Sequence, residues 1–231
     1  MIQYLHETKS YRMYGWVGDK ASDVGIHSYA DSDFAGCPRT LRSTSGAQLQ
    51  MEGEFTCFPI MARSIRQPCV SYSTPEAEIC ALNLAYRTMS LPALDIFDYL
   101  LPVNYPCIFH EDNTACIQVI VSGKNPTMRY LSRTHGINIT FLYENLGLKH
   151  AKNPFQVVYT DTKKMVADIH TKPFVNKARW EHALDLSNTS HREKAAIQRR
   201  IELHHKEWGV SEVNPTQNAS NSTAAPEHLL E

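Results

Sequence analysis

The chain has 231 residues, of which 42% are hydrophobic and 20% are charged, and its formal net charge at pH 7 is −1. This composition supports a sizeable buried core and excludes a wholly disordered protein. No run of about 18 apolar residues occurs, so we expect no membrane span. The opening segment lacks the apolar stretch of a signal peptide, so we expect an intracellular protein.

The near-neutral charge creates no overall positive field that would attract nucleic acid. A nucleic-acid enzyme would then need local basic contacts and metal ions that offset its own carboxylates. No cysteine forms a C-x-x-C pair, so we expect reduced core cysteines rather than a zinc ribbon or redox motif. Zinc and cysteine hydrolases are not expected, because His204 and His205 have no third ligand and no cysteine has a recognisable His-Asn arrangement.

Strands dominate the first part of the chain. Residues 1–14 are expected to form a helix followed by an extended piece. The predicted strands are Gly25–Asp31, Thr44–Met51 and Phe55–Ala62. The sequence Glu52-Gly53-Glu54 suits a hairpin turn between the last two, and Pro59 places the third strand at an edge or a bulge.

The strongest helix start in the sequence is Ser73-Thr74-Pro75-Glu76. Ser73 or Thr74 is a candidate N-cap, Pro75 suits the first turn, and Glu76 favours the positive end of the helix. We expect Pro92 to kink or split this helix.

Strands and helices alternate in the second part of the chain. The predicted elements are a strand at Pro106–Asp112, a helix at Asn113–Val121, a basic loop at Ser122–Arg133, a helix at Ile137–Leu146, a strand at Phe155–Thr160, a helix at Lys163–Thr171, polar helices at Lys177–Leu186 and Arg192–Trp208, and a disordered tail from Val210. This order predicts an α/β fold with a mixed five-stranded sheet, in which three antiparallel strands precede two parallel ones and helices cover both faces.

Four acidic residues occupy positions at which a buried site can form. Asp31 and Asp112 end the first and fourth strands, Glu78 lies in the first turns of the main helix, and Asp168 lies in the last core helix. The first and fourth strands can be neighbours, which would bring Asp31 and Asp112 together at their carboxyl ends. Taken singly, each acid is more simply explained as a turn former or a helix-dipole partner.

Clustered carboxylates repel one another and have raised pKa values unless a cation joins them. Hard oxygen ligands favour Mg²⁺ or Mn²⁺. Two such ions about 4 Å apart can activate a water and stabilise the leaving oxygen of a phosphodiester. The four acids therefore indicate a candidate site for metal-dependent phosphodiester hydrolysis.

Short motifs surround these acids in a fixed order. They are Tyr29–Gly36, Arg42–Gly46, Ser73–Glu78, Glu111–Asn113, Ser132–His135 and Ala167–Pro173. Together they resemble the ribonuclease H domain at the end of the polymerase polyprotein of copia-type LTR retrotransposons. The opening Ile2–Thr8 is similar to the last helix of the preceding reverse transcriptase region. The resemblance covers about residues 1–183, and its specificity lies in the ordered set of motifs.

The resemblance implies a ribonuclease H-like fold and endonucleolytic cleavage of the RNA strand of RNA–DNA hybrids with two Mg²⁺ ions, for which Mn²⁺ is a possible substitute. Asp31, Glu78, Asp112 and Asp168 match the family's catalytic, metal-binding carboxylates. Asp31 would bridge the two metals, Glu78 and Asp112 would complete the site on one, and Asp168 would hold the second. Candidate nucleic-acid contacts are Arg42, Ser43, Thr44, Ser73, Thr74, Asn113 and Arg133.

The resemblance also implies a division of the chain. Residues 1–20 would be the tail of the reverse transcriptase connection region, 21–175 the ribonuclease H domain, 176–209 C-terminal polar helices and 210–231 a disordered tail. The expected partners are an RNA–DNA hybrid and a preceding reverse transcriptase domain, without a membrane. The expected location is the cytoplasm, the nucleus or virus-like particles.

Two other interpretations stay open. The chain could be a catalytically weak or inactive retroelement remnant that folds without cleaving, although retention of all four acids favours activity or only recent loss. It could also be an integrase-type nuclease of the same fold. Those sites usually read Asp, Asp, Glu in chain order, whereas here the glutamate, Glu78, comes second.

Overall fold

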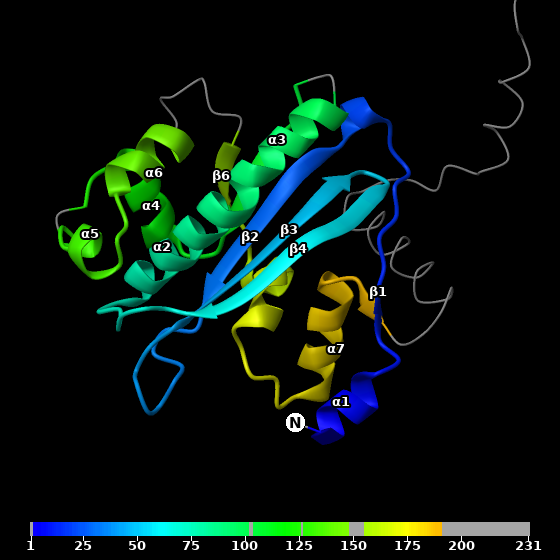
Figure 1. Ribbon diagram of the computed structural model, residues 1–231, viewed down its shortest axis with the longest axis horizontal. Coiled ribbons are helices and arrows are strands. Elements are labelled where there is room, and N and C mark those ends of the chain that lie inside the picture. The colour runs from blue at the N-terminus through cyan, green and yellow to red at the C-terminus, as the bar shows by residue number, and fades with distance from the viewer. Residues whose placement is uncertain (1, 102–103, 126, 148–154, 191–231) are drawn as a thin grey trace, which may run out of the picture.

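The computed structural model of the chain describes residues 2–101, 104–125, 127–147 and 155–190. Its main sheet has five strands in the order β4-β3-β2-β5-β6 (Figure 1). They are β2 (Gly25–Ser32), β3 (Thr44–Gly53), β4 (Thr56–Arg66), β5 (Cys107–Glu111) and β6 (Phe155–Tyr159). β2, β3 and β4 pair antiparallel, whereas β5 runs parallel to both β2 and β6. The predicted mixed sheet is therefore confirmed.

The remaining elements surround this sheet. The α-helices are α1 (Ile2–Thr8), α2 (Thr74–Ala85), α3 (Leu91–Leu100), α4 (Thr114–Ser122), α5 (Leu131–Thr134), α6 (Ile139–Leu146) and α7 (Lys177–Leu186). The tighter 3-10 turns are η1 (Ala21–Asp23), η3 (Thr162–Lys164) and η4 (Val166–His170), and η2 (Tyr86–Ser90) is a π-helical segment. A two-stranded ribbon joins β1 (Arg12–Met13) to β7 (Thr189–Ser190).

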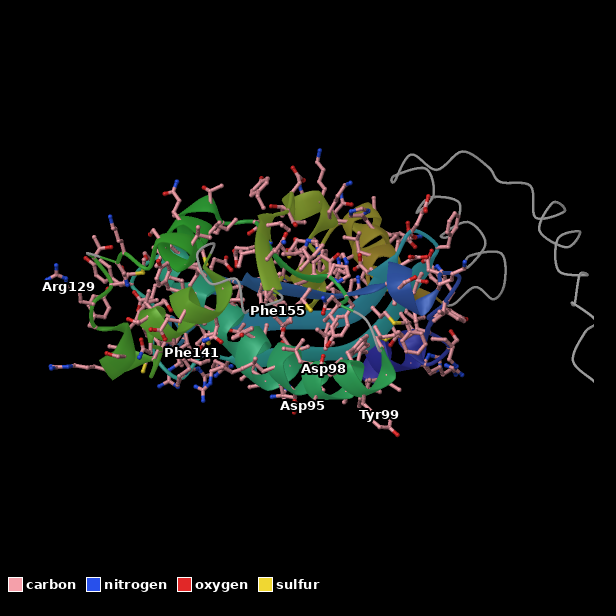
Figure 2. The ribbon with its side chains drawn as sticks, turned by 90° about the horizontal axis from the view of Figure 1, so that it is seen from above. Asp95, Asp98, Tyr99, Arg129, Phe141 and Phe155 are labelled. Atoms are coloured by element: carbon pink, nitrogen blue, oxygen red, sulfur yellow. The ribbon has the colours of Figure 1, made fainter. Side chains whose placement is uncertain are left out.

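The side chains of β2 alternate between two faces of the sheet, as expected for a strand. Ile26 and Ala30 face α2 and join the main apolar core. Tyr29 faces the opposite side and packs in a smaller cluster with Met165 of the η3–η4 segment and Leu186 of α7. Figure 2 shows α2 and α3 on one side of the sheet and α7 on the other. The prediction that helices cover both faces is confirmed.

The face toward α7 carries a buried polar layer that the sequence did not predict. The phenol of Tyr29 donates to Glu52 over 2.8 Å, and His27 Nδ1 lies 3.0 Å from His110 Nε2. His170 Nε2 lies 2.9 Å from the side-chain carbonyl of Gln48. Burial lowers the pKa of both His110 and His170 to about 4. These two histidines are therefore neutral, hydrogen-bonded parts of the sheet surface at neutral pH.

The main helix begins as predicted. The hydroxyl of Ser73 accepts a hydrogen bond from the Glu76 N–H over 3.4 Å, and Pro75 lies in the first turn. The helix does not simply kink at Pro92. It passes through the π-helical segment, in which the Leu91 N–H donates to the Tyr86 carbonyl, and then continues as α3. Because proline cannot donate to the preceding turn, the wider segment absorbs the mismatch.

The predicted helix at Lys163–Thr171 is wrong. This segment consists of two short 3-10 turns separated by Met165, whose backbone is extended and whose side chain is fully buried. Burying Met165 beneath the sheet thus interrupts any regular helix here. The hairpin strands are also longer than predicted, and their turn falls after Gly53 rather than around it.

Two expectations about the first part of the chain are confirmed. The opening residues form a helix followed by an extended piece, and Pro59 lies on the edge strand β4 beside a register irregularity. All six cysteines are free thiols, but the expectation that they lie in the core is confirmed only for Cys57, Cys80, Cys107 and Cys116, because Cys37 and Cys69 are half-buried. None of the helices in the described ranges combines the length and apolar character needed to cross a bilayer. The predictions for Arg192–Trp208 and for the tail from Val210 lie outside the described residues.

Candidate active site

The parallel pairing of β2 with β5 brings two of the predicted acids together. Asp31 is the penultimate residue of β2, and Asp112 directly follows β5. Since Tyr29 pairs with His110, the carboxyl ends of the two strands meet at one edge of the sheet. Glu78 reaches the same place from α2. One carboxylate oxygen from each of Asp31, Glu78 and Asp112 lies within 4.8 Å of the others.

A glycine in β3, Gly46, allows the fourth acid, Asp168, to lie near this group. Gly46 pairs with Asp31 across the sheet. A Cβ atom at Gly46 would stand 2.5 Å from Thr171 Cγ2 and 2.9 Å from the Ala167 carbonyl oxygen. Only glycine therefore lets the η4 segment approach the sheet this closely. Asp168 of η4 is positioned by that approach.

Within the triad of Asp31, Glu78 and Asp112, two carboxylates are buried and the negative charges repel one another. Asp31 is 1% and Glu78 is 3% exposed. Burial, followed by the charges of Glu111, Asp31 and Asp112, raises the pKa of Glu78 to about 10. Among the described residues, Glu78 Oε2 has no hydrogen-bond partner of good geometry. A buried carboxylate oxygen in this state is expected to accept either a proton or a cation.

A fifth acid, Glu111, was missed by the sequence analysis. It is the last residue of β5 and has no exposed surface. One of its oxygens accepts the Asn113 N–H over 3.1 Å, while burial raises the pKa of Glu111 well above the ordinary value. A signal was available in the sequence: Glu111 shares the buried face of β5 with Cys107 and Phe109. It adds to the repulsion that raises the pKa of Glu78.

Asp168 forms an ion pair with a lysine that it shares with Asp31. Its Oδ1 lies 2.6 Å from the ammonium of Lys172, which also lies 3.2 Å from Asp31 Oδ1. Burial, followed by the charge of Asp31, raises the pKa of Asp168 to about 6 despite the opposing effect of Lys172. Lys172 belongs to the Ala167–Pro173 motif but was not among the predicted site residues. The structure thus joins Asp168 to Asp31 through a lysine.

The predicted nucleic-acid contacts separate into two groups. The side-chain oxygens of Ser43, Ser73 and Asn113 accept hydrogen bonds from nearby backbone N–H groups, at 3.0, 3.4 and 3.0 Å respectively. They shape the loop and the starts of α2 and α4. The others are Thr44, which is half-buried at the start of β3, and Arg42, Thr74 and Arg133, which are exposed.

The donor set fits a hard divalent ion. Three carboxylates from three different elements converge, two of them are buried, and an oxygen of Glu78 lacks a hydrogen-bond partner of good geometry in the described structure. Carboxylate oxygens without nitrogen or sulfur ligands are typical of Mg²⁺ and Mn²⁺ sites. Asp31, Glu78 and Asp112 are thus the residues that could hold such an ion.

Comparisons with known proteins give a fold-level likeness. No protein-family model and no curated protein matches the sequence. LC11-RNase H1, isolated from compost by a metagenomic approach, is 14% identical with a TM-score of 0.42, covering 65% of this chain and 93% of that one. RNase H1 from the halophilic archaeon Halobacterium salinarum NRC-1 is 13% identical with a TM-score of 0.40, covering 69% and 97% respectively. At these low scores, the fold is defined by the strand order and pairing described above.

Proposed function

We propose that this chain is a divalent-metal-dependent ribonuclease H that hydrolyses the RNA strand of RNA–DNA hybrids endonucleolytically. In its native setting it would form the C-terminal part of a copia-type retrotransposon reverse transcriptase. The observation that carries the proposal is the meeting of Asp31, Glu78 and Asp112 at the carboxyl ends of two parallel strands, with their oxygens within 4.8 Å.

These residues would hold Mg²⁺, or Mn²⁺ in its place, and the bound ion would supply Lewis-acid polarisation of a phosphodiester and an activated water. The chain's own part is to position the ligands. Asp31 is fixed by the Thr171 hydroxyl and by Lys172, and Asp112 accepts the Thr162 hydroxyl over 2.7 Å. Such fixed ligands reduce the rearrangement needed during the reaction.

The proposed substrate class rests on the resemblance. Exposed Arg42, Thr74 and Arg133 provide charge and a hydroxyl for backbone contacts. A hybrid presents 2′-hydroxyls in a wide, shallow minor groove, through which a protein can distinguish RNA from DNA. The overall charge of −1 means that binding would depend on such local contacts and on the metal.

The first test is cleavage of a labelled RNA–DNA hybrid by the purified full chain in Mg²⁺, Mn²⁺ or EDTA, with double-stranded DNA as a second substrate. We expect metal-dependent cutting of the RNA strand alone. Cutting of DNA, or cutting in EDTA, would contradict the proposed reaction. A folded chain that cuts nothing, even when a reverse transcriptase region is added, would identify an inactive remnant instead.

A single substitution tests the site itself. In Asp112→Asn, the amide oxygen can still accept from Thr162, so the fold should be retained, whereas a negatively charged ligand is lost. We expect cleavage to fall about 1000-fold, which corresponds to about 4 kcal/mol of transition-state stabilisation. The matched control is Asp95→Asn on the exposed surface of α3 (Figure 2), which should cleave as the wild type does. Near-normal cleavage by Asp112→Asn would remove that residue from the mechanism.

A further inference from the structure

Lys172 forms ion pairs with two of the predicted carboxylates, Asp31 and Asp168. Its ammonium donates to Asp31 Oδ1 over 3.2 Å and to Asp168 Oδ1 over 2.6 Å. Lys172 lies two residues beyond the end of η4, and its ion pair with Asp168 spans four residues of the chain. The ammonium thus bridges the two carboxylates that the resemblance assigned to a second metal ion.

This bridge is more than a surface ion pair. The side chain of Asp31 is only 2% exposed, and that of Asp168 is 14% exposed. The other oxygen of Asp31 accepts the Thr171 hydroxyl, which holds the carboxylate in place. The lysine side chain is 35% exposed, but both of its partners are largely buried. Charge-assisted hydrogen bonds to fixed, largely buried carboxylates are stronger than those between mobile exposed groups. The position between Asp31 and Asp168 is therefore already occupied by a cation.

A divalent ion in that same position would share both carboxylates with the ammonium. Two like charges at contact distance in a partly buried site repel strongly. The lysine and a second metal are therefore alternatives for one position. The conflict is smaller at the triad, because in the described structure the ammonium contacts only Asp31 of its three carboxylates and forms its other ion pair with Asp168.

We infer that Lys172 takes the place of the second metal, so that the chain binds one divalent ion, at Asp31, Glu78 and Asp112. This inference rests on the proposed function and narrows it from a two-ion site to a site of one ion and one ammonium. Lys172 is in this sense a positioning residue: it neutralises Asp168 and fixes the shared carboxylate of Asp31.

The test is the number of Mn²⁺ ions bound per full-length chain at saturation, counted by electron paramagnetic resonance in the absence of nucleic acid. We expect one ion for the wild type and two for Lys172→Met, which removes the ammonium but keeps the aliphatic stem. Lys164→Met, an exposed neighbour in η3, is the matched control and should bind one. The double variant Lys172→Met with Asp168→Asn should return to one, because the added position loses a ligand.

Three results would overturn the inference. Two ions in the wild type, or one ion in a folded Lys172→Met, would do so while leaving the triad and the proposed reaction intact. No ion in the wild type would contradict the proposed function as well. If Lys172→Met does not fold, Lys172→Gln replaces it, because its side chain is polar but uncharged. Two ions are expected there, and one would count against the inference.

Discussion

Two sides of one aspartate differ in how negative charge is balanced. Toward α2, Asp31 faces Glu78 and Asp112, and the pKa of Glu78 is raised by burial and by three neighbouring acids. Toward η4, Asp31 faces Asp168 across an ammonium that hydrogen-bonds to both. Burial alone would lower the pKa of Lys172, but Asp31 and Asp168 outweigh it and raise that pKa. The lysine is therefore charged at neutral pH.

The surroundings of Asp31 show that a protein balances some buried charges with its own side chains and leaves others for a ligand. A buried carboxylate without a cation costs folding free energy unless it is protonated. Within the described ranges, the protein supplies a cation, Lys172, beside Asp31 and Asp168, and none in contact with Glu78 and Asp112. The uncompensated side is where a metal ion has most to gain by binding.

The largest expected decrease in cleavage comes from Glu78→Gln, which removes one of the three carboxylates proposed to bind the metal ion. A neutral amide is a weaker ligand for Mg²⁺ than a carboxylate. We expect hybrid cleavage to fall about 1000-fold or more, or about 4 kcal/mol. Initial rates at several Mg²⁺ concentrations would measure it, with Asp95→Asn as the control. Full activity at high Mg²⁺ would mean that Glu78 is dispensable.

The same variant should also change how the free energy of unfolding depends on pH when no metal is bound. The pKa of Glu78 is about 10 in the folded protein, above its ordinary value of 4.5. The folded state therefore binds the proton more tightly, so this stabilisation is complete below about pH 4.5 and is lost as pH rises toward 10. One such group changes stability by at most about 1.4 kcal/mol per pH unit.

Denaturant unfolding in EDTA at pH 5, 7 and 9 would test this linkage. The wild type should lose stability as pH rises, and Glu78→Gln should lose less, because Gln has no proton to release. Mg²⁺ should stabilise the wild type more at pH 9 than at pH 5, since protons compete for the same oxygens. Equal slopes for the two proteins would indicate that Glu78 is ionised in the metal-free state.

A smaller decrease in cleavage is expected from Asp168→Asn, which changes the carboxylate that pairs with Lys172. Asparagine can still accept from Lys172, but the hydrogen bond loses one of its charges. The loss of one charge-assisted hydrogen bond predicts a 10- to 100-fold decrease in cleavage, or about 1.5–3 kcal/mol. Single-turnover rates of Asp168→Asn and Asp112→Asn would show which substitution reduces cleavage more. An equal loss of cleavage in the two variants would contradict the expected difference between Asp168 and the triad.

The smallest effect is expected from Ser73→Ala, which leaves every carboxylate in place. It removes the N-cap of α2, whose second turn carries Glu78. The cost should be about 1 kcal/mol of stability, with cleavage reduced by less than about tenfold. Thr74→Ala, at an exposed position one residue later, is the control and should change stability less. Equal losses in the two variants would show that the Ser73 cap is not what anchors the helix.

Much of this arrangement could be predicted from local patterns. The run Gly25–Asp31 and the run ending at Asp112 are strand-like, and two such strands in this chain order can be parallel neighbours. The Ser73-Thr74-Pro75-Glu76 start follows directly from capping chemistry. The segment at Lys163–Thr171 was misjudged because its helical pattern competes with the burial of Met165, which depends on packing against the sheet.

The sequence by itself determined most of the elements, the mixed sheet and the three acids that meet, because strand alternation, capping and acidic strand ends are local features. Tertiary structure decided which charges meet. Glu111 joins the triad because β5 buries it beneath α2 and α4, and Lys172 reaches Asp31 because Gly46 lets η4 lie against the sheet. Such contacts join residues far apart in the chain, and only packing brings them within range of one another's charge.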